Sequence, residues 1–398
     1  MIIRWPQRYG YSGGIASAFP ELFGKPDTKT MRAAWYVPEV NERRAGLRYR
    51  CTYPIAALQR RGINAALFDE KNAELYDAVT FDAWTLFPTV TSEVAAERAL
   101  ALAERLKANG TRIILDNCDN QFSGSPDQNW RDACNRLRRL ANQANTVITC
   151  SDELASVMQA ECGLTRTPLV IGDPIETRIR YTSDSLLRSI ASPGRKLSWF
   201  RYIRHRAQIT IERSQGISPL VWFGGHGNSF SEGGMLDLKR VVPILSAMSQ
   251  EHPVSLTVIS NNRSKFESHF SDLPFSTHYI EWDRVNFLAM LRLHAISLIP
   301  IALNEFTRCK SANRLTLSLY HGLNVVADAI PSYRDFANVC ALDDWHGGLR
   351  KYLANPGLRN RHKADGKALA LAKFDIDRIA DAWVAALNHA SPSARERQ

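Results

Sequence analysis

Residues 295–333 read AISLIPIALNEFTRCKSANRLTLSLYHGLNVVADAIPSY, and their pattern indicates the fold class. Its first apolar run predicts a buried strand over residues 295–300, and the run NVVA predicts another over residues 324–327. Between them, residues 311–321 have the spacing of a helix that buries one face. A strand, a helix and a second strand joined by short loops predict two parallel neighbouring strands with the helix packed on the sheet.

The same alternation continues on both sides of this stretch and predicts an α/β chain with two Rossmann-like, doubly wound domains facing a cleft. We expect a first domain over residues 1–205 that includes an N-terminal arm and a basic linker. A second domain is expected over 206–375, and a C-terminal helix and tail over 376–398 that packs back toward the first domain. Further strands are expected at 32–37, 63–68, 78–81, 112–115, 146–149, 220–223, 255–259 and 278–281, and further helices at 49–61, 91–108, 127–144, 236–249, 285–293 and 358–387, with Ser151 as the cap of another helix.

The composition is that of a globular protein. The chain has 398 residues, of which 45% are hydrophobic and 23% charged, and these values exclude disordered and fibrous classes. No window approaches ~18 uninterrupted apolar residues, and the opening MIIRWPQRYGYSGG lacks the apolar segment of a secretory signal. The seven cysteines form no C-x-x-C pair, which is typical of reduced thiols and unlike a structural zinc site. We therefore expect a cytoplasmic protein.

Basic residues exceed acidic ones, and the net charge is +10. The excess either reflects an arginine-rich base composition or indicates an anionic partner such as a phosphate-bearing substrate, an anionic membrane or a nucleic acid. The segment GRKLSWFRYIRHRAQ at 194–208 interleaves basic and aromatic residues and is amphipathic if helical. Residues 196–206 are then either an interdomain helix with packed aromatic side chains or a patch that binds the inner face of a membrane.

A glycine-rich loop follows the strand expected at 220–223. Residues 221–236 read VWFGGHGNSFSEGGML, so a buried strand is followed by glycines and then by a helix. Glycines let backbone amides approach a phosphate closely, and a helix N-terminus adds favourable partial charge. The dinucleotide fingerprint G-x-G-x-x-G is not met, because Phe230 stands where its third glycine would be.

Lys310 and Ser311 are expected to open the helix at 311–321, with Arg314 one turn later on the same face. Lysine, a hydroxyl, free amides and arginine at a helix start can hold a diphosphate. The alternative is a solvated basic helix start. Ligands bind at the carboxyl ends of strands in such folds, which favours the diphosphate site.

These motifs carry a resemblance to a family. The segments GHGNSFSEGGMLDL, IEW at 280–282 and FTRCKSANRL with HGLNVVADAIPSY look like the C-terminal half of GT-B glycosyltransferases. They resemble most the family 4-like bacterial enzymes of surface-polysaccharide synthesis, which often show K-S-x-x-K-x-x-E and then G-x-P-V-V. In the first half RYRCTYPIAALQRRGINAALF, ILDNCDNQF, TVITCSDELASVM and LVIGDPIE are similar to that group as well.

The resemblance implies a nucleotide-sugar donor on the second domain, with no metal ion and no other cofactor. The donor residues it implies are Gly225, His226, Gly227, Asn228, Ser229, Trp282, Glu305, Lys310, Ser311 and Arg314. The chain departs from the family at Leu317 and Cys309, which stand where the family has acids, and at Asn324, which replaces a proline. Contact with the donor ribose and the stereochemistry of transfer are therefore left open.

Catalytic candidates in the first domain are carboxylates, because all ten histidines lie at or beyond residue 205. Acids follow the expected strands at Asp69, Asp82, Asp116 and Asp119. We assign the catalytic role to Asp116 and Asp119, since a carboxylate can deprotonate an acceptor hydroxyl. The alternative is that these residues cap loops. Gly46, Arg48 and Arg50 are assigned to an acceptor phosphate, with solvated helix arginines as the alternative.

The prediction is a metal-independent glycosyltransferase, cytoplasmic or peripheral on the inner face of a membrane. It would transfer a sugar to a hydroxyl of a glycan or lipid-linked acceptor in surface-polysaccharide synthesis. One alternative is an enzyme that glycosylates nucleic acid, which the net charge permits. The other is a non-catalytic subunit of GT-B fold that only binds, which Leu317 and Cys309 permit.

Overall fold

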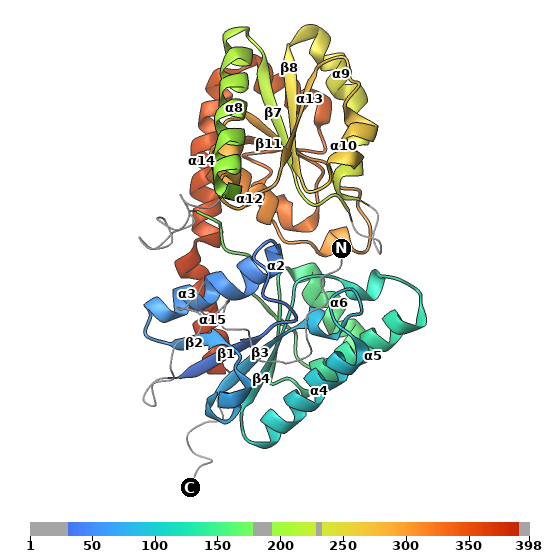
Figure 1. The fold of residues 1–398 in the computed structure, drawn as a ribbon, viewed down its shortest axis with the longest axis vertical. Coiled ribbons are helices and arrows are strands. Elements are labelled where there is room, and N and C mark those ends of the chain that lie inside the picture. Colours follow the sequence, from blue (N-terminus) through green and yellow to red (C-terminus); the bar gives the residue numbers. More distant parts are fainter. Residues whose placement is uncertain (1–30, 178–192, 228–232, 390–398) are drawn as a thin grey trace. The chain divides into compact units, whose positions relative to one another are not determined.

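The computed structural model describes residues 31–177, 193–227 and 233–389 of a chain that divides into two compact units. Unit 1 contains residues 1–174 and 376–398, and unit 2 contains residues 175–375 (Figure 1). This division differs from the boundary expected at residue 205. Helix α8 (Pro193–Ser214) is continuous across residue 205 and packs against strand β7 (Ser218–Phe223), so the basic segment belongs to unit 2.

Unit 1 is built on six parallel strands in the order β2-β1-β3-β4-β5-β6. The strand order reverses between β1 and β3, so the crevice that binds ligands in open α/β sheets is expected at the C-terminal ends of these strands. The central strands are buried along their length, which explains their nearly continuous apolar sequences. The strands are β1 (Arg32–Tyr36), β2 (Asn64–Leu67), β3 (Ala78–Asp82), β4 (Arg112–Asn117), β5 (Thr146–Thr149) and β6 (Leu169–Val170).

The long helices of unit 1 begin at residues whose side chains cap them. Ser92, Asp127 and Ser151 each accept a hydrogen bond from the backbone amide three residues later, and the cap at Ser151 was predicted. Helix α6 ends at Gly163, which takes a left-handed φ of 62°. The helical segments are α2 (Ala45–Leu47), a π-helical turn η2 (Arg48–Thr52), α3 (Tyr53–Arg60), η3 (Glu70–Leu75), η4 (Ala83–Leu86), α4 (Glu93–Ala108), η5 (Gln121–Ser123), α5 (Gln128–Gln143), α6 (Asp152–Cys162) and α15 (Ile376–His389).

Unit 2 contains a second sheet of six parallel strands, in the order β12-β11-β10-β7-β8-β9. Counted within the unit, this is the order 6-5-4-1-2-3 of dinucleotide-binding folds, and it reverses between β7 and β10. The remaining strands are β8 (Val254–Ser260), β9 (Ser276–Glu281), β10 (Ile296–Ile299), β11 (Asn324–Ala327) and β12 (Ala341–Leu342). The helical segments after α8 are η6 (Gly234–Arg240), α9 (Val242–Glu251), α10 (Arg263–Phe270), α11 (Phe287–Leu291), η7 (Thr307–Cys309), α12 (Asn313–Tyr320), η8 (Pro331–Phe336), α13 (Trp345–Ala354) and α14 (Pro356–Phe374).

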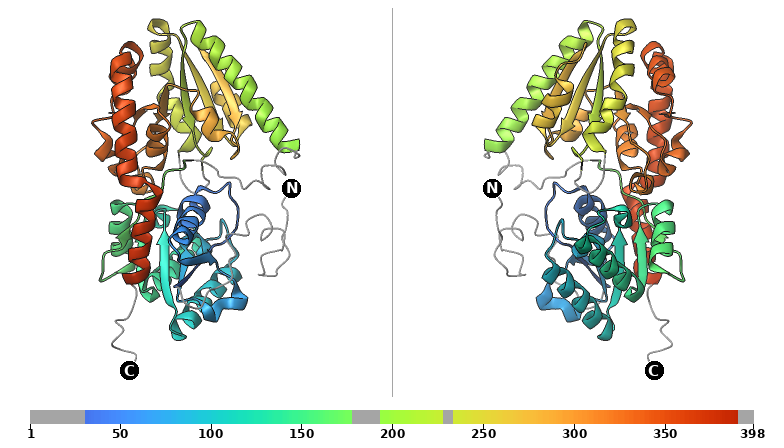
Figure 2. Two further views of the ribbon diagram at one scale, coloured as in Figure 1. Left: turned by 90° about the vertical axis from the view of Figure 1, so that its left-hand side faces the viewer. Right: turned by 90° about the vertical axis from the view of Figure 1, so that its right-hand side faces the viewer.

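Two apolar layers sandwich the sheet of unit 2. One layer packs α11, α12 and α14 on the sheet, and α8 lies on this same face; the other packs α9, α10 and α13 on the opposite face (Figure 2). Sequence periodicity predicted most of these elements but not the short helices α10 and α13. The single helix expected at 358–387 is also two helices, because Asp375 takes an extended ψ of 142° and ends α14.

Candidate functional site

The C-terminal ends of β3 and β4 bring carboxylates together in unit 1. Asp82 and Asp116 are register partners in neighbouring parallel strands, so their backbones lie about 4.8 Å apart. Asp119 follows β4, and its carboxylate accepts a hydrogen bond of 3.0 Å from the indole N–H of Trp84. The two predicted catalytic acids, Asp116 and Asp119, are thus at this edge together with Asp82, for which no catalytic role was predicted.

Asp116 forms a buried ion pair with Arg50. Two guanidinium nitrogens donate to its carboxylate at 2.6 and 3.1 Å, and both side chains are about 5% exposed. Arg50 also donates to Asp173 at 3.3 Å and to the carbonyls of Ile171 and Gly172. Burial alone would lower the pKa of Arg50, but the carboxylates of Asp116 and Asp173 raise it above its ordinary value. The polar groups of this pair are therefore satisfied by partners inside the unit.

Asp82 is the carboxyl of this edge that is suited to exchange a proton. Burial, with a smaller contribution from the nearby charge of Asp116, raises its pKa to about 7, and the amide of Trp84 and the cation of Arg44 oppose the shift. A group with a pKa near neutrality serves well as a general base. The sequence does contain a signal for the position of Asp82. The runs AVTFD and RIILD form neighbouring strands, and each ends in an aspartate at the same register position.

The residues predicted to hold an acceptor phosphate lie inside unit 1. The guanidinium group of Arg48 donates to the carbonyl of Glu42 at 2.6 Å, and the residue is 4% exposed. Gly46 lies beside the end of β4, where an added Cβ would be 4.0 Å from the sulfur of Cys118. The π-helical turn Arg48–Thr52 is buried throughout, so the structure places the guanidinium groups of Arg48 and Arg50 in the interior.

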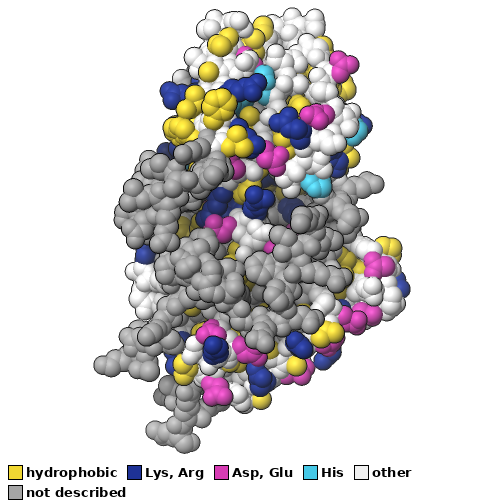
Figure 3. Space-filling model, in the orientation of Figure 1, with side chains coloured by type: hydrophobic (Ala, Val, Ile, Leu, Met, Phe, Trp, Pro, Cys, Tyr) yellow, Lys and Arg dark blue, Asp and Glu magenta, His cyan; other side chains and the backbone are white. Residues whose placement is uncertain are grey.

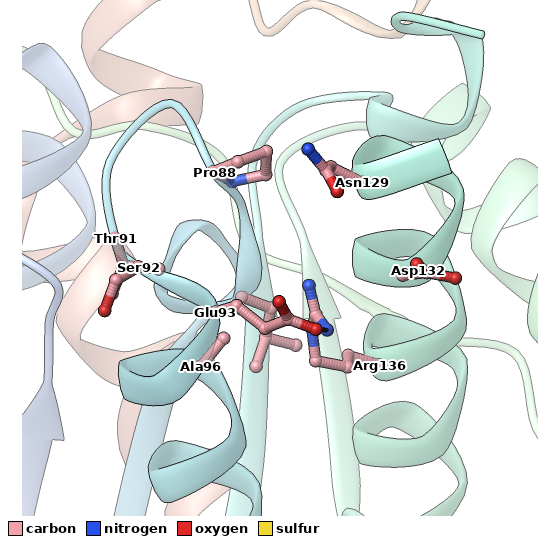
Figure 4. A pocket seen from close by; sticks show the side chains of 9 residues that line it. Pro88, Thr91, Ser92, Glu93, Ala96, Asn129, Asp132 and Arg136 are labelled. Atoms are coloured by element: carbon pink, nitrogen blue, oxygen red, sulfur yellow. Dashed lines mark ion pairs between the residues drawn. The ribbon is translucent and has the colours of Figure 1, made fainter. Parts of the chain in front are cut away.

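A polar pocket of about 240 Å³ lies between the N-terminal turns of α4 and α5 in unit 1 (Figure 4). Its most buried charge is Arg136, which is 7% exposed and pairs with Glu93 at 3.7 Å and Glu97 at 3.3 Å. Figure 4 shows Glu93 and Arg136 pointing toward one another on one side, with Asn129 and Pro88 at the other end. No sequence motif indicated this pocket.

In unit 2 a glycine loop, residues 224–227, follows β7 at the point where the strand order reverses. Gly227 has a φ of 115°, and an added Cβ would lie 2.9 Å from the carbonyl oxygen of Gly233, so a side chain is excluded. The amide of His226 donates to Asn261, and the ammonium of Lys265 donates to the carbonyl of His226 at 2.8 Å. The predicted donor residues Asn228 and Ser229 lie outside the described residues.

Arg314 lies against this glycine loop. An added Cβ at Gly224 would be 3.4 Å from a guanidinium nitrogen of Arg314. The same guanidinium donates a hydrogen bond to Tyr333 and is close enough to Asp237 to oppose the rise in the pKa of that carboxyl that burial causes. Arg314 is half-buried, in the first turn of α12.

The helix start differs from the prediction. Helix α12 begins at Asn313, because Lys310 has an extended ψ of 147° and ends the short helix η7 instead. The ammonium of Lys310 lies over the ring of Phe306, 4.0 Å from its centroid. Lys310 and Ser311 therefore precede the helix, and Ser311 is buried at 8% exposure.

The other predicted donor residues surround this edge. Trp282 follows β9 and packs on the ring of Phe287, and the exposed Glu305 pairs with Arg308 at 3.6 Å. Leu317 and Cys309, which replace the acids of the resembling family, are 3% and 1% exposed within the apolar core. Contact between Leu317 and a ligand ribose is excluded by this burial.

Within residues 31–177, 193–227 and 233–389, no three or more His, Cys, Asp or Glu side chains are grouped so that they can hold a metal ion. In the same segments, no helix combines the length and the apolar character that crossing a membrane requires.

No protein-family pattern matches the sequence, and no curated protein is similar to it. Solved structures are similar in fold. HepE of Anabaena in complex with UDP is 11% identical, with a TM-score of 0.62 over 90% of this chain and 100% of that one. A glycosyltransferase of Rickettsia africae is 9% identical, with a TM-score of 0.57 over 92% and 100%. The UDP-forming α,α-trehalose-phosphate synthase of Burkholderia vietnamiensis is 12% identical, with a TM-score of 0.55 over 92% and 99%. The predicted fold is thereby confirmed: the chain has the two Rossmann-like domains of the GT-B architecture.

Proposed function

We propose that this protein is a glycosyltransferase that takes a sugar from a nucleotide-diphosphate donor and transfers it to a hydroxyl group. The observation that carries the proposal is the glycine loop at the strand-order reversal of unit 2, with the guanidinium of Arg314 against it. Backbone amides without intervening side chains, together with a fixed cation, are suited to bind a diphosphate. The fold likeness to proteins solved with UDP supports a uridine nucleotide as the first donor to test.

In this proposal the donor binds at the strand ends of unit 2. Cleavage of the sugar–phosphate bond leaves negative charge on the departing diphosphate, and preorganised amides and cations stabilise that charge. Arg314 and Lys310 are the cations of the predicted motif, and they would supply this charge without a metal ion or another cofactor. Ribose contact must come from a residue other than Leu317, because Leu317 is in the core.

The acceptor hydroxyl would bind at the strand ends of unit 1, where Asp82 would accept its proton. The pKa of about 7 gives Asp82 a substantial ionised fraction at neutral pH and enough basicity to take the proton. Asp116 would have a structural role instead, because its ion pair with Arg50 fixes the positions of both side chains at these strand ends. The proposal that the acceptor is a glycan or a lipid-linked chain of surface-polysaccharide synthesis is based on the resemblance of the sequence motifs.

A second candidate is a subunit that binds nucleotide sugars without turning them over. It is favoured by the burial of Leu317 and Cys309, which replace two acids of the resembling family with core side chains. Both candidates predict nucleotide binding, and only the first predicts release of nucleotide diphosphate and loss of that release in Asp82→Asn.

The test is thermal denaturation of the purified chain with a panel of uridine, guanosine, cytidine and thymidine diphospho-sugars. A ligand at ~100-fold above its Kd should stabilise the protein by about 2.7 kcal/mol. Arg314→Met should remove this response, whereas Arg350→Met should keep it, because Arg350 is on helix α13 and pairs with Glu251. A flat response to every nucleotide sugar, or an unchanged response in Arg314→Met, would reject the donor site.

A further inference from the structure

Helix α8 of unit 2 packs a polar side against the sheet. Ser198, His205 and Glu212 recur every seven residues and are 5%, 4% and 2% exposed. Each has a polar partner: Asn286 donates to Ser198 at 2.7 Å, Ser255 donates to Glu212 at 2.6 Å, and the ring of His205 contacts the hydroxyl of Thr257 at 3.4 Å. Ile209 is buried on the same side at 1% exposure, so the buried side is mostly polar, whereas a helix of a globular protein ordinarily turns an apolar stripe inward.

The outward side of α8 is apolar. Phe200, Ile203 and Ile211 fall about half a turn from the polar stripe at 3.6 residues per turn. The exposed fractions of the large apolar residues on this helix are 51% for Leu197, 55% for Trp199, 63% for Phe200, 49% for Ile203 and 52% for Ile211. Figure 3 shows hydrophobic side chains beside Lys and Arg in this part of the surface. Large apolar side chains gathered on one exposed face mark an interaction site.

The polar contacts fix which side faces outward. Glu212 also pairs with the ring of His278 at 2.5 Å, and the ring of His205 lies 5.5 Å from that of the buried His294. Rotating α8 to bury its apolar side would leave the hydroxyls of Ser255 and Thr257 buried without their partners, which is costly. The exposed apolar side is therefore a consequence of the packing beneath it.

The charges on the outward side have one sign. Arg204 and Arg206 are exposed beside the apolar residues, and Arg201 is exposed at the border with the polar stripe. The helix has a single acidic residue, Glu212, which is buried. Pairing this surface with the same surface of a second copy would bring like charges together. An anionic membrane surface, with phosphate headgroups above an apolar interior, is complementary both to the arginines and to the apolar side chains.

We propose that the outward face of α8, defined by Leu197, Trp199, Phe200, Ile203 and Ile211 with the three arginines, binds an anionic membrane surface. The apolar side chains enter the boundary between headgroups and acyl chains, and the arginines contact lipid phosphates. This inference goes beyond the proposed glycosyl transfer and does not depend on it. It assigns unit 2, which would hold the donor, as the part that meets the membrane.

The experiment is flotation of the full chain with vesicles of phosphatidylcholine alone or of phosphatidylcholine with phosphatidylglycerol, at low and high salt. We expect binding to the anionic vesicles only, and weaker binding as salt screens the phosphates. Equal binding to both vesicle types, or binding to neither, overturns the proposal.

Two matched pairs of variants locate the contact. Trp199→Ser with Phe200→Ser should lower vesicle partitioning at least ~10-fold, whereas Val94→Ser with Leu75→Ser, two exposed apolar positions in unit 1, should leave it unchanged. Replacing Arg201, Arg204 and Arg206 by Gln should lower it on the order of 100-fold. Replacing Lys71, Arg98 and Arg361 by Gln removes the same charge elsewhere and should have a much smaller effect.

Three readouts separate membrane binding from other uses of this face. Brominated lipids should quench part of the tryptophan fluorescence, and Trp199→Phe should lose that part while still binding vesicles. If Trp199→Ser with Phe200→Ser unfolds at lower urea concentration, the face packs within the chain and the proposal is wrong. If light scattering instead shows a dimer that this variant dissociates, with no vesicle binding by the wild type, the occupant is a second copy and the proposal is also wrong.

Discussion

At the strand ends of unit 1 the chain gathers carboxylates, whereas at the strand ends of unit 2 it gathers glycine amides and cations. In unit 1 the charges are side chains held inside the protein, and the ion pair of Arg50 with Asp116 is about 5% exposed. In unit 2 the loop 224–227 is partly open, and Arg314 is half-buried beside it. Both edges follow a reversal of strand order in a six-stranded parallel sheet.

The difference shows how one scaffold supports two chemistries. Burial raises the pKa of a carboxyl toward neutrality, and the strand ends of unit 1 bury Asp82 together with Asp116. A phosphate site has the opposite requirement, because backbone amides must remain accessible to the ligand. The residues that follow the strands, rather than the sheets themselves, determine which chemistry each edge can perform.

The largest expected effect is that of Asp82→Asn on transfer. Removing a general base should lower the rate about 10²- to 10⁴-fold, and the wild-type rate should rise with pH through about 7 as Asp82 ionises. The stability of the folded wild type should fall over a pH range in which the rate rises. Because the folded pKa of Asp82 is above the ordinary 3.8, the wild type loses stability as pH rises from about 4 to 7, and the variant does not. Nucleotide release and melting temperature against pH measure both effects.

Asp116→Asn is the matched control for this prediction. It removes charge one strand away but breaks the ion pair with Arg50, so it should lower the melting temperature where Asp82→Asn raises it. A wild-type rate and an unchanged pH profile in Asp82→Asn would exclude Asp82 as the base.

Replacing one arginine in each unit by methionine separates stability from binding. Arg50→Met leaves Asp116 and Asp173 buried without their cation and should cost about 3–5 kcal/mol in the free energy of unfolding. Arg314→Met removes a donor to the buried hydroxyl of Tyr333 and should cost about 1–3 kcal/mol in stability. It should also weaken nucleotide binding about 10- to 150-fold. Urea unfolding, with hydrogen exchange to resolve the two units, and calorimetric titration measure these quantities. Equal losses of stability in the two variants would contradict the contrast between the buried charges at the strand ends of unit 1 and the partly exposed ones of unit 2.

Much of this framework can be predicted from the sequence, because each buried strand is an apolar run with a recognisable end. The runs AVTFD and RIILD end in aspartate and VWFGG ends in glycine, and these ends are where the structure places the two edges. Periodicity also predicted a helix at 311–321 that contains Arg314, and the structure has α12 there. The positions of strands and the residues at their ends are local properties, so local patterns suffice.

The burial of Arg50 could not be predicted in this way. The segment RYRCTYP has the appearance of an exposed helix start, and the partners of Arg50 are 66 and 123 residues away along the chain. Helix α8 shows the same limit. Its spacing predicts which residues share a face, but the partners that turn Glu212 inward, Ser255 and His278, lie on strands β8 and β9. Which face is buried depends on those strands.

Acid should weaken unit 2, whereas a rise in pH toward neutrality weakens unit 1 through Asp82. Burial lowers the pKa of His205 to about 4 and of His294 to about 3, so the unfolded chain binds protons that the folded chain does not. Their contribution to stability is present above about pH 6.5 and is lost as pH falls toward 4, by up to about 1.4 kcal/mol per pH unit for each histidine. Replacing both by Gln should flatten this slope in urea unfolding between pH 4 and 6.5. An unchanged slope would place the acid sensitivity elsewhere.

The smallest expected effect concerns how Lys310 reaches a ligand at the open edge of unit 2. Its ammonium lies 4.0 Å from the centroid of Phe306, and leaving that ring costs about 0.5–1 kcal/mol. Phe306→Leu removes the competing ring, so nucleotide binding should tighten roughly 2- to 5-fold, although the buried Phe306 also makes the variant less stable. In a Lys310→Ala background the same substitution should leave the Kd unchanged, because no ammonium remains to be released. Calorimetric titration of the four proteins in this cycle measures the coupling directly. If Phe306→Leu tightens nucleotide binding equally with and without Lys310, Phe306 affects binding independently of that ammonium. Lys310 would then have no part in the diphosphate site.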